Sequence, residues 1–269
     1  AGLHYRPLRL NQQKKEKPMA GNPQAGDHIV KSYDEELENL NNDIIKMGGL
    51  AEAQIARSIE SVVRRDPELA TRVIADDELV DDLNYEIDIQ TMRLLALRQP
   101  MALDLRYIVA ALKISADLER IADYAANISK RAITLSSAAP VPPVHSIPRM
   151  SRMAQQMVKE VLDAFIARDV DKAVAVWHSD ETLDIMYTSL FREALTYMIE
   201  DPRSTSMCTH LLFIAKNIER IGDHVTNIAE TIYFLVHGDR LRETRPKGGG
   251  DVETMNMPFS PDTEKDAKE

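Results

Sequence analysis

The distribution of glycine is the feature that most restricts what this chain can fold into. Its 269 residues include 10 glycines, and none of them lies between Leu50 and Ile221. Tight hairpin turns depend on glycine, so a hairpin-rich β architecture is disfavoured over that span. Glycine-rich phosphate loops and dinucleotide-binding turns are excluded there as well, because both need backbone conformations that side chains obstruct.

Proline divides this span into segments of helical periodicity. Apolar residues recur every three or four positions between the prolines, as at Leu40, Ile44 and Met47, which is the pattern of an amphipathic helix. Proline suits the first turn of a helix and interrupts its interior, so Pro67 and Pro100 mark helix boundaries. The pattern predicts an all-α fold of six helices, in which two precede residue 100 and the others cover about 103–134, 149–168, 170–200 and 204–237.

The chain divides into five segments. Two helical units, residues 28–136 and 149–238, are joined by a connection rich in proline, serine and alanine at 137–148. Residues 1–27 form a basic extension, and residues 239–269 form a tail that contains three consecutive glycines. Neither terminal segment has hydrophobic periodicity, so we expect both to be flexible.

The two helical units repeat one another. Residues 117–128 (DLERIADYAANI) correspond to 217–228 (NIERIGDHVTNI) at an offset of 100. Residues 65–66 (RD) and 77–81 (DELVD) correspond to 168–169 (RD) and 180–184 (DETLD) at an offset of 103. This self-similarity predicts two tandem, pseudo-symmetric three-helix bundles.

Composition narrows the partners and the compartment. A formal charge of −10 disfavours nucleic acid as the main partner and is compatible with cations. Cys208 is the single cysteine, so no disulfide can form within the chain. No apolar run has the length of a transmembrane helix, and the basic N-terminal segment lacks the apolar stretch of a signal peptide. We therefore expect a cytoplasmic protein.

Four pairs of acidic residues at i, i+4 spacing occupy matching places in the two halves. This spacing puts both carboxylates on one helix face, where they repel each other unless solvent or a cation compensates. Hard metal ions accept carboxylate oxygens, and pairs on adjacent helices can bridge ions. Spacing alone is a weak indication in a chain with 43 acidic residues, and solvation of a helix face is the alternative interpretation. The pairs in register are Asp77/Asp81, Glu119/Asp123, Asp180/Asp184 and Glu219/Asp223.

Asparagine and arginine accompany the acidic pair on the third helix of each half. Asn127 and Asn227 continue the acidic face, where they either support metal ligands or form an interhelical hydrogen bond. Arg120 and Arg220 adjoin the glutamates. They either pair with a neighbouring helix, anchor the acidic cluster, or contact a phosphorylated or acidic partner.

Several enzyme signatures are missing from the sequence. No Glu-x-x-His motif occurs, which disfavours a ferritin-like di-iron enzyme. Walker, kinase and Gly-x-Ser-x-Gly signatures are also missing. We assign no catalytic residue.

These residues resemble the PhoU family, regulators of high-affinity phosphate uptake in bacteria. The resemblance rests on 104–106 (DLR), 117–123 (DLERIAD) and 218–230 (IERIGDHVTNIAE), and covers about residues 32–238. Ala122 departs from the family pattern, which usually has glycine there. The second half has 204–206 (STS) where the first has DLR, and the N-terminal extension lies outside the pattern.

The resemblance implies two similar three-helix bundles with multinuclear metal clusters of iron, zinc, magnesium or manganese. By position, the first cluster has the ligands Asp77, Asp81, Glu119 and Asp123, and the second has Asp180, Asp184, Glu219 and Asp223.

The resemblance also implies a homodimeric, non-enzymatic regulator that is at most peripheral to membrane complexes. Its partners would be the ATPase subunit of the phosphate ABC transporter and a membrane sensor histidine kinase. It would restrain phosphate import and keep the starvation response off when phosphate is plentiful.

Two other hypotheses stay open. In one, the acidic clusters are centres of a two-metal hydrolase that acts on a phosphoester. In the other, the chain is a metal-free helical scaffold for protein contacts.

Overall fold

The computed structural model describes residues 23–141 and 145–242, with side chains described from Ser32 onward. Within these residues the chain forms helices and no strand, which confirms the all-α prediction. The elements are α1 (Pro23–Arg64), α2 (Pro67–Asp76), α3 (Glu78–Arg98), α4 (Leu103–Ser136), α5 (Ile147–Ala167), α6 (Val170–Glu200), the 3-10 turn η2 (Pro202–Ser204) and α7 (Thr205–His237).

Asp77 divides the second helical segment into α2 and α3. Its own dihedral angles are helical, with φ of −60° and ψ of −36°. The backbone N–H groups of Val80 and Asp81 both donate to its carbonyl oxygen. The two helices are therefore consecutive parts of one segment, and each half of the molecule has three helical segments, as the repeat predicts.

Most of the two terminal segments that we predicted to be flexible lies outside the residues that the structure describes. α1 already begins at Pro23, inside the predicted extension 1–27. Residues 1–22 and 243–269 lie outside the described residues, as do residues 142–144 of the predicted linker.

The repeated Arg–Asp pair builds the same turn in both halves. Arg65 and Arg168 follow α1 and α5 in the left-handed conformation, with φ of 58° and 52°. Asp66 and Asp169 then cap α2 and α6, where each side chain accepts a hydrogen bond of 2.9 Å from the backbone N–H three residues further on. Helices commonly end in a left-handed glycine, and arginine takes that place in this glycine-free span.

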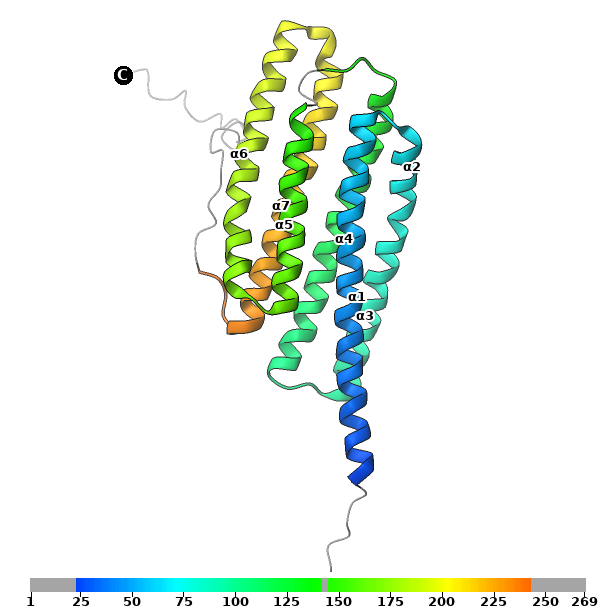
Figure 1. Ribbon diagram of the computed structural model, residues 1–269, viewed down its shortest axis with the longest axis vertical. Helices are drawn as coiled ribbons and strands as arrows, with labels where there is room; N and C mark the ends of the chain where they lie inside the picture. The colour runs from blue at the N-terminus through cyan, green and yellow to red at the C-terminus, as the bar shows by residue number, and fades with distance from the viewer. Residues whose placement is uncertain (1–22, 142–144, 243–269) are drawn as a thin grey trace, which may run out of the picture.

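The two bundles lie side by side (Figure 1). α1, α2, α3 and α4 pack together in the first, and α5, α6 and α7 in the second. Contacts of α4 with α7 and of α1 with α5 join the bundles. Leu40, Ile44 and Met47 are fully buried, as their helical spacing predicts. α4 and α7, which carry the repeated acidic motif, therefore occupy the centre of the molecule.

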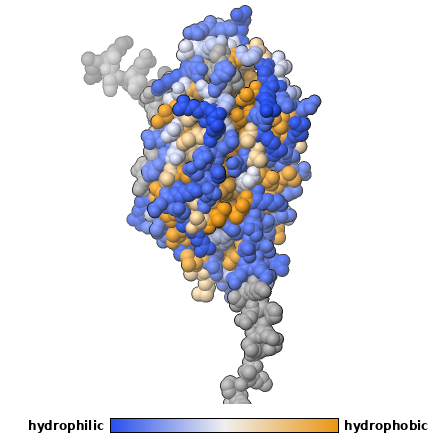
Figure 2. All heavy atoms as spheres, viewed as in Figure 1, coloured by the Kyte–Doolittle hydropathy of each residue, from blue (hydrophilic) through white to orange (hydrophobic). Residues whose placement is uncertain are grey.

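The surface mixes hydrophilic and hydrophobic side chains. On the face shown in Figure 2, hydrophobic residues are interspersed among hydrophilic ones. In the described part of the chain, no helix combines the length and the apolar character that crossing a membrane would need.

Candidate functional site

The first acidic cluster brings together the four carboxylates of the first half. Asp77 and Asp81 lie at the α2–α3 junction, and Glu119 and Asp123 lie midway along α4, which packs against both α2 and α3. Burial, together with the negative charges of Asp123, Asp81 and Glu119, raises the pKa of Asp77 to about 6, against the opposing charge of Lys130. The two pairs therefore meet at one level, although they begin at different places along their helices.

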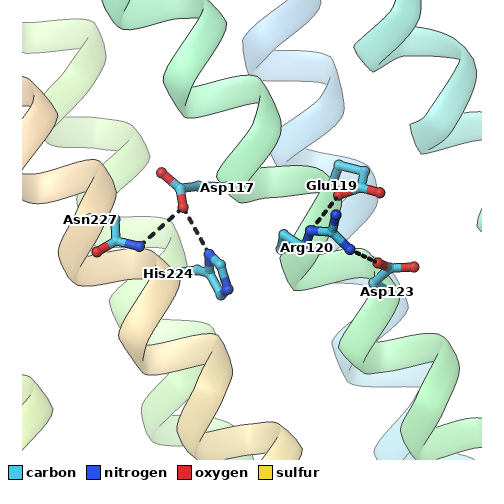
Figure 3. A network of polar contacts seen from close by, with 6 residues as sticks. All are labelled: Asp117, Glu119, Arg120, Asp123, His224 and Asn227. Atoms are coloured by element: carbon cyan, nitrogen blue, oxygen red, sulfur yellow. Dashed lines mark hydrogen bonds and ion pairs between the residues drawn. The ribbon is translucent and has the colours of Figure 1, made fainter.

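Arg120 anchors this cluster from within α4. Its Nη1 donates a hydrogen bond of 2.9 Å to Asp123, and its Nε lies 3.4 Å from Glu119 Oε2 (Figure 3). Burial raises the pKa of Glu119 and the charge of Asp123 adds to the rise, whereas Arg120 opposes it. Of the roles considered for Arg120, anchoring the acidic cluster is the one that this geometry supports.

The second cluster, between α6 and α7, is more deeply buried. The side chain of Asp180 is fully buried, and that of Glu219 is 13% exposed. Burial raises the pKa of Glu219. Lys216, which donates to Glu219 Oε1 at 2.6 Å, opposes this rise, and Asp223 and Asp180 add to it. The other oxygen, Oε2, is buried and makes no hydrogen bond, so it retains a free acceptor site that a cation would satisfy.

Asp184, the fourth residue of this cluster, lies one helical turn after Asp180 on α6 and is partly buried. Its place on α6 matches that of Asp81 on α3, as the repeat predicts.

Gly222 makes room for the buried carboxylate of Asp180. A Cβ atom at position 222 would lie 2.7 Å from Asp180 Oδ1 and 2.6 Å from Leu183 Cδ2. In the first half, Ala122 corresponds to Gly222 and Val80 corresponds to Leu183. The larger alanine of the first half thus faces the smaller valine, and the smaller glycine of the second half faces the larger leucine. Glycine thereby lets α6 carry both leucine and a buried carboxylate against α7.

The clusters suit cations in their chemistry but do not form a ready ligand set. Carboxylate oxygens, raised pKa values and the free Oε2 of Glu219 all fit a site for a hard cation. In the described residues, however, no three His, Cys, Asp or Glu side chains are grouped closely enough to hold a metal ion. Metal binding by these carboxylates therefore requires side-chain rotation.

A polar group joins the two bundles, and two of its three members, Asp117 and His224, were not among the residues selected in the sequence analysis. Asp117 on α4 accepts hydrogen bonds from His224 Nδ1 at 2.8 Å and from Asn227 Nδ2 at 3.2 Å, both on α7 (Figure 3). The His224 ring also lies against Tyr124, with 5.6 Å between the ring centroids. Asn227 therefore forms the interhelical hydrogen bond that was one of its two expected roles.

The repeat itself holds the signal that could have identified this group. Asp117 corresponds to Asn217, and His224 corresponds to Tyr124, so these are two of the six positions at which the twelve-residue motifs differ, and the two at which a residue able to carry charge is exchanged for a neutral one. A contact between two similar halves needs complementary residues rather than identical ones, and these differences mark where the halves meet.

Arg220 and Asn127 take roles that differ from those of their counterparts. Arg220 lies over the ring of Tyr124 on α4, 5.8 Å from its centroid, and so contacts the other bundle. Asn127 Oδ1 accepts a hydrogen bond of 3.2 Å from Lys130 Nζ on the same helix.

Comparison with known proteins matches both bundles to one family. The family model described as "PhoU domain" matches residues 44–132 and 147–232, one match in each bundle. A relative from Caulobacter vibrioides, "Phosphate-specific transport system accessory protein PhoU homolog", is 53% identical over 82% of this chain and 96% of its own length. The "Phosphate-specific transport system accessory protein PhoU" of Serratia marcescens is 38% identical over 84% of this chain and 91% of its own length.

Two solved structures share the fold. The crystal structure of PhoU from Pseudomonas aeruginosa is 38% identical, with a TM-score of 0.75 over 77% of this chain and all of that one. The crystal structure of the phosphate transport system regulatory protein PhoU from Streptococcus pneumoniae is 26% identical, with a TM-score of 0.73 over 78% of this chain and all of that one.

Proposed function

Because the chain belongs to the PhoU family, we propose that it is a cytoplasmic accessory protein that restrains uptake by a phosphate-specific transport system. The observation that carries the proposal is the 53% identity to a relative of that name over 96% of the relative's length. The family model likewise matches both bundles, at residues 44–132 and 147–232.

We further propose that the protein acts by contact rather than by catalysis. Its partners would be the ATPase subunit of the phosphate ABC transporter and a membrane sensor histidine kinase, and the acting form would be a homodimer. Exposed apolar side chains along α3, including Tyr85, Met92 and Leu97, supply surface for such contacts and support this proposal.

The two acidic clusters are proposed as sites for iron, zinc, magnesium or manganese ions. Asp77, Asp81, Glu119 and Asp123 would hold the cations of the first, and Asp180, Asp184, Glu219 and Asp223 those of the second. The bound ions would supply positive charge that neutralises the carboxylates and ties α2 and α3 to α4, and α6 to α7. The free Oε2 of Glu219 and the buried carboxylate of Asp180, which packs against Gly222, support this proposal.

A metal-free scaffold is the competing function, and one observation favours it. The described residues contain no group of three ligands ready to hold an ion. Thermal unfolding with and without a chelator separates the two functions. If cations are bound, chelation lowers the melting temperature, whereas a metal-free scaffold keeps the same melting temperature.

Phosphate uptake by living cells tests the proposed function. A strain that lacks this protein is expected to import labelled phosphate and express a starvation reporter even in phosphate-rich medium, and the wild-type gene is expected to reverse both effects. The tagged chain should also recover the transporter ATPase and the sensor kinase from phosphate-replete cells. Normal uptake by the deletion strain would contradict the accessory role, and recovery of neither partner would contradict the contact mechanism.

A further inference from the structure

A groove with a positively charged lining runs between α4 and α7. Its volume is about 520 Å³. It is lined by four cationic side chains and one histidine, and eight of its nine lining residues are polar or charged. The charged lining consists of Lys130, Arg131, His210, Lys216 and Arg220.

Three of the four cations form no ion pair in the part of the chain that the structure describes, although the charge of Lys130 also acts on Asp77. Only Lys216 forms an ion pair, with Glu219 at 2.6 Å. Lys130 donates to the neutral amide of Asn127 instead. The groove thus concentrates unpaired positive charge on a chain whose net charge is −10, so general attraction of anions to the whole molecule does not account for it.

Aromatic rings hold the two guanidinium groups in place. The guanidinium of Arg131 lies 4.1 Å from the ring centroid of Phe213, and its Nη1 lies 3.4 Å from His210 Nδ1. Arg220 lies over Tyr124 across the bundle interface. A guanidinium that stacks by its face still presents its N–H groups at its edge, where they match the oxygens of a phosphate group.

The repeat shows that packing α4 against α7 does not require these cations. The same two helices meet again at the opposite end of the interface, where Lys113 lies over Phe234. At that end, the repeat places residues of other types at the positions of Lys130, Arg131, His210 and Lys216. They are Glu230, Thr231, Ala110 and Ala116.

We propose that this groove binds a soluble anion that carries several phosphate groups. Four cations spread along a groove of this volume fit a chain of phosphates better than a single phosphate ion. An acidic peptide fits less well, because Phe213 is the only apolar side chain in the lining and so offers the peptide's own side chains little to pack against. The proposal is independent of the transport role, although Lys216 of the groove also pairs with Glu219 of the second acidic cluster.

Isothermal titration calorimetry of the full chain with sodium tripolyphosphate tests the proposal. The groove variant is Lys130→Gln/Arg220→Gln, since both residues are exposed and neither forms an ion pair within the described residues. It does remove the contact of Arg220 with the ring of Tyr124. The control, Lys113→Gln/Lys159→Gln, removes two exposed positive charges outside the groove. The groove variant is expected to bind at least about tenfold more weakly than wild type, and the control within about twofold of wild type.

A second variant covers the case in which the first is poorly folded. Thr134→Glu adds a negative charge at an exposed position of the groove and is expected to weaken binding to a similar extent. The proposal would be overturned if the groove and control variants lost the same amount of affinity for tripolyphosphate, or if the wild type did not bind it. So would equally tight binding of orthophosphate or of a polyglutamate peptide.

Discussion

The sizes of Leu183 and Gly222 set how closely α6 approaches α7 in the second cluster. Leu183 and Asp180 both face Gly222, and a Cβ there would come within 2.7 Å of each. The first half has the reverse combination, with Val80 and Ala122 at these places. The two halves therefore fill the same contact with different pairs of residues, and in each half the size of one residue limits the size of the other.

Gly222→Ala is expected to destabilise the protein by about 1–3 kcal/mol, because the new methyl group overpacks a buried site. Adding Leu183→Val restores the combination of the first half and should recover about 1 kcal/mol of that loss. Urea unfolding of the two single variants and the double variant measures this coupling. Simple additivity of the two single effects would contradict the packing explanation.

The break between α2 and α3 places Asp77 where its charge is unfavourable. Its folded pKa of about 6 lies above the ordinary value of 3.8, chiefly because of burial. The folded chain therefore binds this proton more tightly than the unfolded chain does. The resulting stabilisation is complete below pH 3.8 and is lost as the pH rises through 6.

Asp77→Asn should accordingly stabilise the metal-free protein at pH 7.5 and have little effect at pH 4, because asparagine resembles the protonated acid. The expected gain at pH 7.5 is about 1–2 kcal/mol, allowing for the partial exposure of the site. Chelator-treated samples melted between pH 4 and pH 7.5 provide the measurement, with the exposed Asp82→Asn as control. A variant less stable than wild type at pH 7.5, or a difference that does not change with pH, would contradict this expectation.

Sequence periodicity and proline placement predict the helices well, because both act locally. The predicted helix 170–200 agrees with α6 at both ends, and 103–134 stops two residues short of the end of α4. The break at Asp77 was not predicted, since its dihedral angles stay helical and no glycine or proline marks it.

Side-chain roles at the candidate site were predicted less completely, because they depend on contacts between helices. Arg120 and Arg220 are equivalent in the repeat, yet one pairs with acids of its own helix and the other stacks on Tyr124. The counterpart of Tyr124 is His224, which faces Asp117 instead. The position within one half does not reveal which residue of the other half lies opposite.

At the scale of the whole molecule, the α4–α7 contact determines how the two bundles sit together. Asp117 contributes a mostly buried carboxylate, with hydrogen bonds from both His224 and Asn227. The same helix pair holds the positively charged groove at its other end. One interface thus carries a hydrogen-bonded link between the halves and, separately, a set of cations available to a ligand.

Asp117→Ala is expected to lower the free energy of unfolding by about 1–3 kcal/mol, because it leaves two donors on α7 without their acceptor. Asn217→Ala, at the corresponding place in the other half, is the matched control and should change stability by less than about 0.5 kcal/mol. Chemical denaturation followed by circular dichroism compares the two variants. Equal losses would show that the Asp117 contacts do not hold the bundles together.

Metal content after equilibrium dialysis tests most directly whether the acidic pairs in register are cation sites. Glu119→Gln/Asp123→Asn and Glu219→Gln/Asp223→Asn each remove one cluster. Glu78→Gln/Asp82→Asn removes an exposed pair of the same spacing that lies outside the register.

Dialysis against manganese or zinc, followed by elemental analysis, is predicted to give about half of the wild-type metal in each cluster variant and the full amount in the control. Equal metal content in wild type and all three variants would contradict the assignment of these carboxylates as ligands.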